Sequence, residues 1–262
     1  MRNFIASLSV ESTKALKSKM LWGTIIFFIF IAIMLGFLML VAKHPEIGGK
    51  SEVLSMKASM ISKADWPTFF WLLLQMALTI GSIGPAIVAI WVFGREYSDR
   101  TIKDILALPV SRTDIVIAKF TVVFIWSAVL LLLLYAFGLL SGLLINLDGW
   151  KNELFIQKTC SFLGSAFLSI LLCPVIAFIT CISRGYMLPV GFSILLLIVT
   201  QVVFLGIPSV TPYFPWAVPG LFSGVAGPFS PKPGAISYFI LCLTSVLGIG
   251  GTIAWWRFAD HH

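Results

Sequence analysis

The residues best able to do chemistry lie in one short stretch, Phe93–Phe120, which reads FGREYSDRTIKDILALPVSRTDIVIAKF. This stretch holds nine charged residues, although only 11% of the 262 residues of the chain are charged. If residues 95–108 form a helix, the acids and bases fall into i,i+4 pairs, each contributing roughly 0.2–0.5 kcal/mol to helix stability. The pairs are Arg95–Asp99, Glu96–Arg100, Asp99–Lys103 and Arg100–Asp104. The spacing therefore predicts a short, rigid helix with internally paired charges.

This charged helix would also have an apolar edge. The edge consists of Ile102, Ile105, Leu106 and Leu108. Pro109 would end the helix, and SRTD at 111–114 resembles a capping box that starts the next one. A solvated hairpin whose charges only fix topology would explain the Lys and Arg residues, but not the four acids or the apolar edge. A docking surface for another protein explains both.

Other chemical sites are not indicated. Gly49-Lys50-Ser51 resembles the end of a phosphate-binding loop, but His44 stands where the motif needs its first glycine. Apart from His261 and His262, which resemble the remnant of a tag, His44 is the only histidine. No Asp or Glu lies within an apolar run, which disfavours an intramembrane protease and an ion-coupled carrier. The cysteines have no metal-ligand spacing and are expected to be small buried hydrophobes; they are Cys160, Cys173, Cys181 and Cys242. We therefore expect no catalytic site and no metal in this chain.

The elements that must position the charged stretch are apolar. Hydrophobic residues make up 59% of the chain and the mean hydropathy is +1.01, whereas soluble domains are about 25% charged. Several apolar runs reach the roughly 20 residues that span a bilayer. The predicted fold is an all-α integral membrane protein, a single transmembrane domain over 1–262 with six spans. The spans are expected at about 20–42, 68–93, 117–147, 155–182, 186–207 and 235–256.

The distribution of basic residues predicts the orientation. With the N-terminus inside, eleven Lys and Arg residues lie on the inner side and seven on the outer side, which favours cytoplasmic termini. Residues 1–19 are too polar to span. Phe4, Ile5, Leu8, Ala15 and Leu16 can share one helical face, with Glu11, Lys14 and Lys17 elsewhere, as in an amphipathic helix at the inner interface. A solvated N-terminal tail is the alternative.

A proline-rich segment, residues 208–233, precedes the last span. It is too broken for a straight helix and too apolar for an extended loop in water. We expect a re-entrant outer lid of short half-helices that includes Tyr213, Pro215, Trp216 and Pro219. The alternative is an outer loop whose Tyr213 and Trp216 lie at the headgroup level.

Polar groups within the spans have two possible roles. Gln75, Thr79 and Gln201 could line a substrate path or hydrogen-bond between helices, and the second role is favoured here. Gly138 and Gly142 form a G-x-x-x-G pattern that would allow close helix packing.

The charged stretch resembles the corresponding loop in permease subunits of type-2 ABC exporters. The resemblance lies in Glu96, the DRT at 99–101, the LALPVSR at 106–112 and Lys119. VESTKALKSKMLW at 10–22 is similar to the N-terminal interfacial helix of that family, and the Pro/Trp-rich segment is similar to its outer re-entrant helices. Many members have Gly-Thr where this chain has Arg100-Thr101, which leaves the subfamily open.

The resemblance implies an ATP-driven exporter. Two permease chains, identical or different, would pair in the bacterial plasma membrane above two cytosolic ATPase subunits, which would bind the ATP and Mg. No nucleic acid partner is implied, and membrane lipid surrounds the permease pair. The loop between spans two and three would be the coupling helix that rests on the ATPase. Its coupling residues would be Glu96, Asp99, Arg100, Thr101, Ile102, Lys103, Asp104, Ile105 and Leu106.

The cargo and two alternative functions remain open. An apolar pathway without fixed charge suits amphipathic cargo such as a peptide antibiotic, a lipid or a hydrophobic drug. A secondary transporter or channel that works without ATP is one alternative. A membrane scaffold that recruits a cytosolic protein through the charged stretch is the other.

Overall fold

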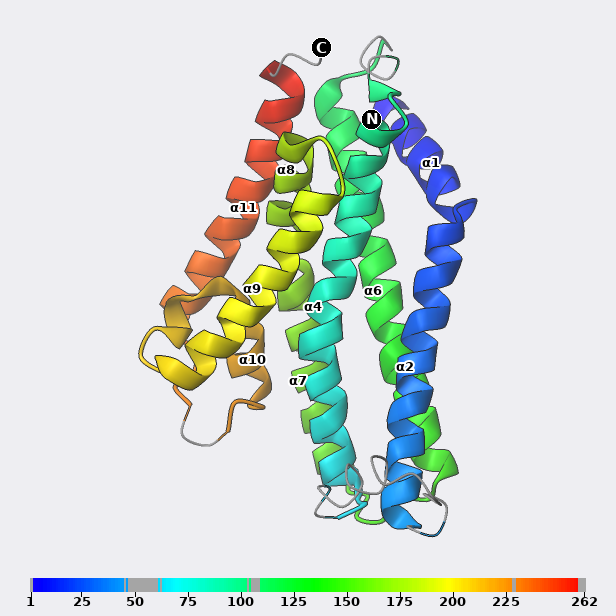
Figure 1. The fold of residues 1–262 in the computed structure, drawn as a ribbon, viewed down its shortest axis with the longest axis vertical. Helices are drawn as coiled ribbons and strands as arrows, with labels where there is room; N and C mark the ends of the chain where they lie inside the picture. The colour runs from blue at the N-terminus through cyan, green and yellow to red at the C-terminus, as the bar shows by residue number, and fades with distance from the viewer. Residues whose placement is uncertain are drawn as a thin grey trace.

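The computed structural model describes residues 2–44, 46, 61, 63–102, 104, 109–227 and 230–258. Their helices form an elongated bundle, with both ends of the chain at the same end of the molecule (Figure 1). The helices are α1 (Arg2–Leu16), α2 (Lys19–Lys43), α4 (Trp66–Ser98), α6 (Arg112–Leu144), α7 (Asn152–Ile170), α8 (Cys173–Ser183), α9 (Met187–Gly206), η2 (Thr211–Tyr213), η3 (Pro215–Ala217), α10 (Val218–Ser223) and α11 (Ala235–Phe258).

In the described residues, six helical stretches are long and apolar enough to cross a membrane, which confirms the predicted number of spans. They are α2, α4, α6, the pair α7–α8, α9 and α11. The fourth span is broken at Leu171 and Leu172, just before Pro174. A proline ring clashes with the carbonyl four residues earlier, here that of Ile170, so α7 ends at that residue.

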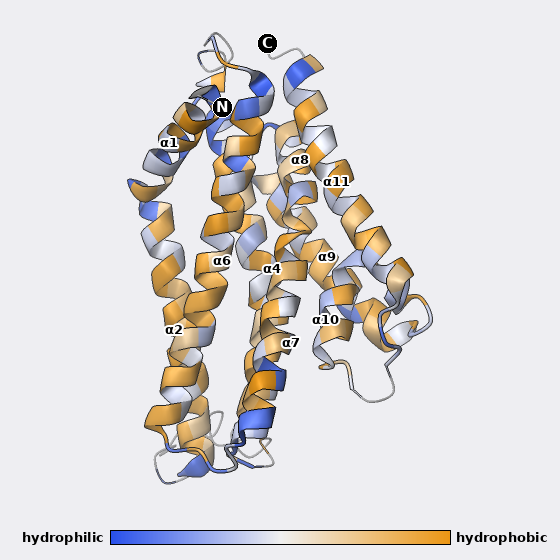
Figure 2. Ribbon diagram, turned by 180° about the vertical axis from the view of Figure 1, so that it is seen from behind, coloured by the Kyte–Doolittle hydropathy of each residue, from blue (hydrophilic) through white to orange (hydrophobic). Residues whose placement is uncertain are grey.

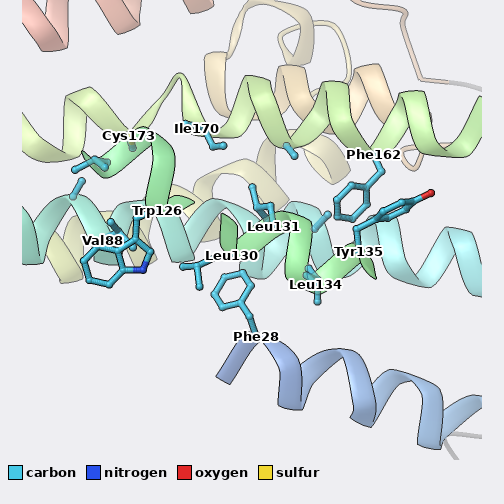
Figure 3. Close-up of a cluster of buried hydrophobic side chains, with 14 of the residues drawn as sticks. Phe28, Val88, Trp126, Leu130, Leu131, Leu134, Tyr135, Phe162, Ile170 and Cys173 are labelled. Atoms are coloured by element: carbon cyan, nitrogen blue, oxygen red, sulfur yellow. The ribbon is translucent and has the colours of Figure 1, made fainter. Parts of the chain in front are cut away.

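The core lies between α4, α6 and the helices on either side of them. A Cβ at Gly138 would lie 2.7 Å from Leu73 Cδ1, and one at Gly142 would lie 2.8 Å from Trp66 Cη2. The G-x-x-x-G pattern of α6 therefore lets α4 approach closely, as expected. Figure 3 shows Phe28 of α2 pointing toward Leu130 of α6. Large apolar side chains fill the space that the glycines leave.

Hydrophobic residues predominate along the length of the helices (Figure 2), and many of them are exposed on the outside of the bundle. On α2, Ile26 and Phe30 are more than half exposed, and on α9 so are Ile198 and Leu205. In a soluble protein such a surface would be unfavourable, whereas lipid chains solvate it in a bilayer. The chain is therefore a multi-pass membrane protein.

The N-terminal segment forms a helix, α1, which ends where Ser18 caps α2 by accepting a hydrogen bond from the Leu21 backbone N–H at 3.1 Å. Its exposed face differs from the prediction. Ile5 and Leu16 are exposed, whereas Glu11 is 5% exposed and points into the bundle. The prediction that Glu11 lies away from the packed face of the helix is wrong. The helix α1 packs against α6, where Glu11 accepts a hydrogen bond from Lys119.

The proline-rich segment contains the short helices η2, η3 and α10, in agreement with the expected half-helices. In Figure 1 these elements lie beside α9 and the beginning of α11, away from the end that holds the termini. Their depth in a membrane stays a prediction.

Candidate functional site

A buried lysine lies where α1, α4 and α6 meet. Lys119 of α6 is fully buried, and its Nζ donates to Glu11 Oε2 at 2.9 Å, Glu96 Oε1 at 2.8 Å and the Val92 carbonyl at 3.2 Å. An ammonium group has three protons to donate, so these three acceptors satisfy it completely. Moving one of these helices away would leave a charge without its partner in this apolar position, which is unfavourable. The lysine therefore holds the three helices together.

Further groups complete the ion cluster, which comprises Glu11, Lys14, Arg95, Glu96, Thr101 and Lys119. Lys14 Nζ lies 3.0 Å from Glu11 Oε1 and 3.1 Å from Glu96 Oε1, and so bridges both carboxylates. Thr101 donates its hydroxyl to Glu96 Oε2 at 2.6 Å. Glu96 therefore joins the helix bundle directly to the first residues after α4.

The end of α4 departs from the predicted charged helix. The helix ends at Ser98, Asp99 is its C-cap, and Arg100 takes a left-handed conformation with φ 58°. The Thr101 N–H bonds the Glu96 carbonyl at 3.0 Å, the long reverse bond of a Schellman-type ending. The predicted continuous helix over 95–108 is therefore wrong at this point. Glu96 pairs with Lys119 and Lys14 instead of Arg100.

The connecting segment, residues 99–111 between α4 and α6, is described in part. Ile102 and Asp104 are helical. Ile102, expected on the docking edge, is 8% exposed and packs into the core of this chain, whereas Asp104 is exposed. Lys103, Ile105, Leu106 and Leu108 lie outside the described residues.

The start of α6 contacts the last helix. Ser111 is the N-cap of α6 but makes no side-chain capping bond, so the expected capping box is wrong. Arg112 Nη1 instead donates to the carbonyls of Trp256 and Arg257, both at 3.1 Å. A cation favourably binds the free carbonyls at a helix C-terminus. Lys119 Nζ also lies 5.9 Å from the ring centroid of Trp256, so α11 is tied to the same region.

A second feature is a cavity of about 230 Å³ bounded by α4, α7, α8, α9, η3 and α10. It brings together Gln75 and Thr79 of α4 with Gln201 of α9, the three polar residues singled out from the sequence. Of the predicted lid residues, Trp216 and Pro219 line the cavity, whereas Tyr213 and Pro215 are not part of its lining.

The polar lining does not join the helices to one another. The hydroxyls of Thr79, Ser82 and Thr200 donate to carbonyls of their own helices, at 3.0, 2.9 and 2.6 Å. Within the described part of the chain, the carboxamides of Gln75 and Gln201 have no hydrogen-bond partner. The favoured prediction, hydrogen bonds between helices, is therefore wrong for these three residues in the described part of the chain; they line the cavity, and a role in a substrate path stays a prediction.

Part of the ion cluster was indicated by sequence motifs. Glu11, Lys14, Glu96 and Lys119 all belong to the motifs that carried the resemblance. Their mutual contact was not predicted, because Lys119 and Glu11 are 108 residues apart in the chain. A lysine inside the first turns of an apolar span requires buried acceptors, and this was the available clue.

Comparisons with known proteins identify the family of the chain. A family model described as "ABC-2 family transporter protein" matches residues 7–200, from α1 into α9. The chain is also similar to the bacitracin transport permease protein BCRB of Bacillus licheniformis, with 29% identity over 213 residues, which cover 78% of this chain and all of that protein. The ion cluster lies wholly within the matched region, and the chain belongs to the ABC-2 transporter family as a multi-pass membrane permease.

Proposed function

We propose that this chain is the membrane subunit of an ATP-driven exporter and receives mechanical work at the connecting segment. The family membership supports an ABC transporter subunit and implies ATPase partners. The observation that carries the proposal is the position of Glu96. Its carboxylate holds Thr101, the beginning of the connecting segment, and Lys119 of the next span at the same time.

This geometry would convert a displacement of the connecting segment into a movement of helices. A displacement of residues 101–104 is transmitted to Glu96, at the end of α4, through the hydrogen bond from Thr101. Because Lys119 binds Glu96 and Glu11 together, α6 and α1 follow α4 as one body. Arg112 and its contacts with the end of α11 carry the same movement to the last span. The helices that line the cavity then change their spacing.

The proposed assembly holds two ATPase subunits and a second permease chain. The ATPase subunits bind ATP and Mg and carry out the hydrolysis, while this chain does no catalysis. Both termini, the ion cluster and the connecting segment lie at one end of the bundle, which in this proposal faces the cytoplasm of a bacterium. Exposed Asp104 and the neighbouring residues through Leu106 contact the ATPase.

The proposed cargo is amphipathic. The cavity is lined by apolar side chains and by uncharged amides and hydroxyls, without a charged residue among them. The similar protein of Bacillus licheniformis is named for transport of bacitracin, which makes a peptide antibiotic one candidate for export by this chain.

Co-purification with the ATPase tests this function. The Arg100→Glu/Lys103→Glu and Ile105→Asp/Leu106→Asp variants should insert into the membrane normally but lose the ATPase during purification. Lys151→Glu is the matched control, since Lys151 is exposed and lies at the beginning of α7, far from both termini. Equal ATPase recovery in all variants would exclude the connecting segment as the contact. Transport by the purified chain without ATP would instead indicate a secondary transporter.

A further inference from the structure

Two unpaired carboxamides share the cavity. Gln75 extends from α4 and Gln201 from α9, and no other group in the described residues hydrogen-bonds either amide. A polar group that is taken out of water without a partner costs free energy, and lipid chains offer no replacement. The hydroxyls of Thr79, Ser82 and Thr200 are already bonded to their own helices. The two amides are therefore free donors and acceptors of the cavity wall, together with the Ser169 hydroxyl and the Trp216 indole N–H.

The remaining lining is uncharged and mostly apolar. Leu78, Ile83, Leu196 and Phe204 contribute to it together with Trp216 from η3. An ionised ligand group would meet no counter-charge there and would keep its full desolvation cost. The wall therefore selects a neutral polar group attached to an apolar one.

The size of the cavity restricts what enters it. About 230 Å³ is more than the roughly 150 Å³ of an engineered cavity that takes benzene. It is less than the roughly 300–1,000 Å³ of pockets that enclose drug-sized molecules. The cavity holds one apolar chain or ring, not a whole peptide.

The cavity opens toward the lipid-facing surface of α9. Leu205, part of its lining, is 85% exposed, and Gln201 is exposed as well. Next to this opening α9 and α10 pack closely, since a Cβ at Gly220 would lie 2.8 Å from Phe204 Cζ. A chain can therefore enter from the membrane beside α9 while the rest of its molecule stays outside.

We propose that this cavity binds a single apolar chain of an uncharged amphiphile, with its hydroxyl, ester or amide group bonded by Gln75 and Gln201. Identifying the bound amphiphile as cargo rests on the proposed export function. Binding itself requires neither ATP nor a partner subunit, so the two proposals can fail separately.

Photolabelling of the purified full chain in lipid nanodiscs tests the site. The probe is a monoacylglycerol with a diazirine on its acyl chain, and the labelled peptides are identified by mass spectrometry. Label is expected on peptides of α4 and α9 that line the cavity. The double variant Gln75→Leu/Gln201→Leu should label roughly tenfold less there, because two hydrogen bonds are lost. Gln157→Leu is the matched control, since Gln157 is exposed on α7 and outside the cavity.

Two further arms make the result decisive. Ala86→Phe fills the cavity and should abolish the label, whereas Ala254→Phe on the exposed side of α11 should not change it. An alkyl sulfonate probe of the same chain length, which stays ionised in a membrane, should label the cavity much less than the monoacylglycerol. Equal labelling of the Gln75→Leu/Gln201→Leu or Ala86→Phe protein, or equal labelling by the ionised probe, would overturn the proposal.

Reconstitution with the ATPase distinguishes an exported amphiphile from a resident lipid. If ATP moves the bound probe to the other leaflet, the site binds exported cargo; if the probe stays bound through turnover, the site holds a resident lipid. Both results support the cavity as a binding site for a neutral amphiphile. If the chain labels as expected but recruits no ATPase, the export function fails and the binding site stands.

Discussion

Lys119 Nζ lies 2.8 Å from Glu96 Oε1 in a position where neither side chain is more than 2% exposed. The two residues belong to different spans, and Glu11 of α1 contacts the same ammonium group at 2.9 Å. A buried pair of this kind holds its helices in a fixed arrangement, since separating them would leave charges without partners.

Replacement of Lys119 by methionine should destabilise the protein strongly. The variant keeps the volume of the side chain but leaves Glu11 and Glu96 with only the outer cations Lys14 and Arg95. Loss of one partner of a buried ion pair costs about 3–5 kcal/mol. Thermal unfolding in detergent should show a large decrease in Tm. Adding Glu11→Gln and Glu96→Gln to the same protein should recover much of the lost stability. A Lys119→Met protein as stable as the parent would show that the ion cluster does not stabilise the bundle.

Arg100 gives a test of the left-handed turn after α4. Its φ of 58° is unfavourable for a residue with a Cβ and costs roughly 1–2 kcal/mol relative to glycine. Arg100→Gly should therefore leave the Tm equal or higher, while Arg100→Val should lower it, because a β-branched residue tolerates this conformation least. The same unfolding measurement in the two variants separates the conformation from the charge. A lower Tm for Arg100→Gly than for Arg100→Val would contradict the turn described here.

The contact between α8 and α11 depends on a glycine. A Cβ at Gly248 would lie 2.7 Å from the backbone of both Pro174 and Val175, whereas at Gly250 nothing lies within 4 Å. Gly248→Ala should cost about 1–3 kcal/mol, because backbone atoms must move apart. Gly250→Ala should be neutral or stabilising by about 0.5–1 kcal/mol, because alanine favours the helix. Unfolding curves that rank the two variants the other way would show that α11 does not pack at Gly248.

The spans were predictable because hydropathy is a local property of the chain. Each apolar run, such as the one that forms α2, predicts a span independently of the helices that pack against it. The break before Pro174 could also be anticipated from the proline alone. The end of α4 could not. The i,i+4 spacing favours a continuous helix, but Glu96 gains more from a fully buried lysine 23 residues away than from an exposed arginine one turn on.

The candidate sites depend on contacts that no local pattern contains. Gln75 and Gln201 were noted as polar groups in apolar runs, yet only the packing of α4 against α9 brings them to one cavity. The sequence predicts Glu11 away from the apolar face of its helix, because nothing in residues 1–19 reveals a buried cation on α6. The left-handed conformation of Arg100 could not be predicted either, because no glycine at this position indicates it.

The most direct test of the central claim is a cross-link from the connecting segment. Asp104→p-benzoylphenylalanine places a photoreactive group at an exposed position of that segment, and Asp148→p-benzoylphenylalanine is the control at an exposed position between α6 and α7. After irradiation of intact membranes, an adduct with a nucleotide-binding ATPase subunit should form at position 104 and not at position 148. Absence of that adduct at 104, or an equal adduct at 148, would contradict the claim that this segment receives the work of ATP hydrolysis.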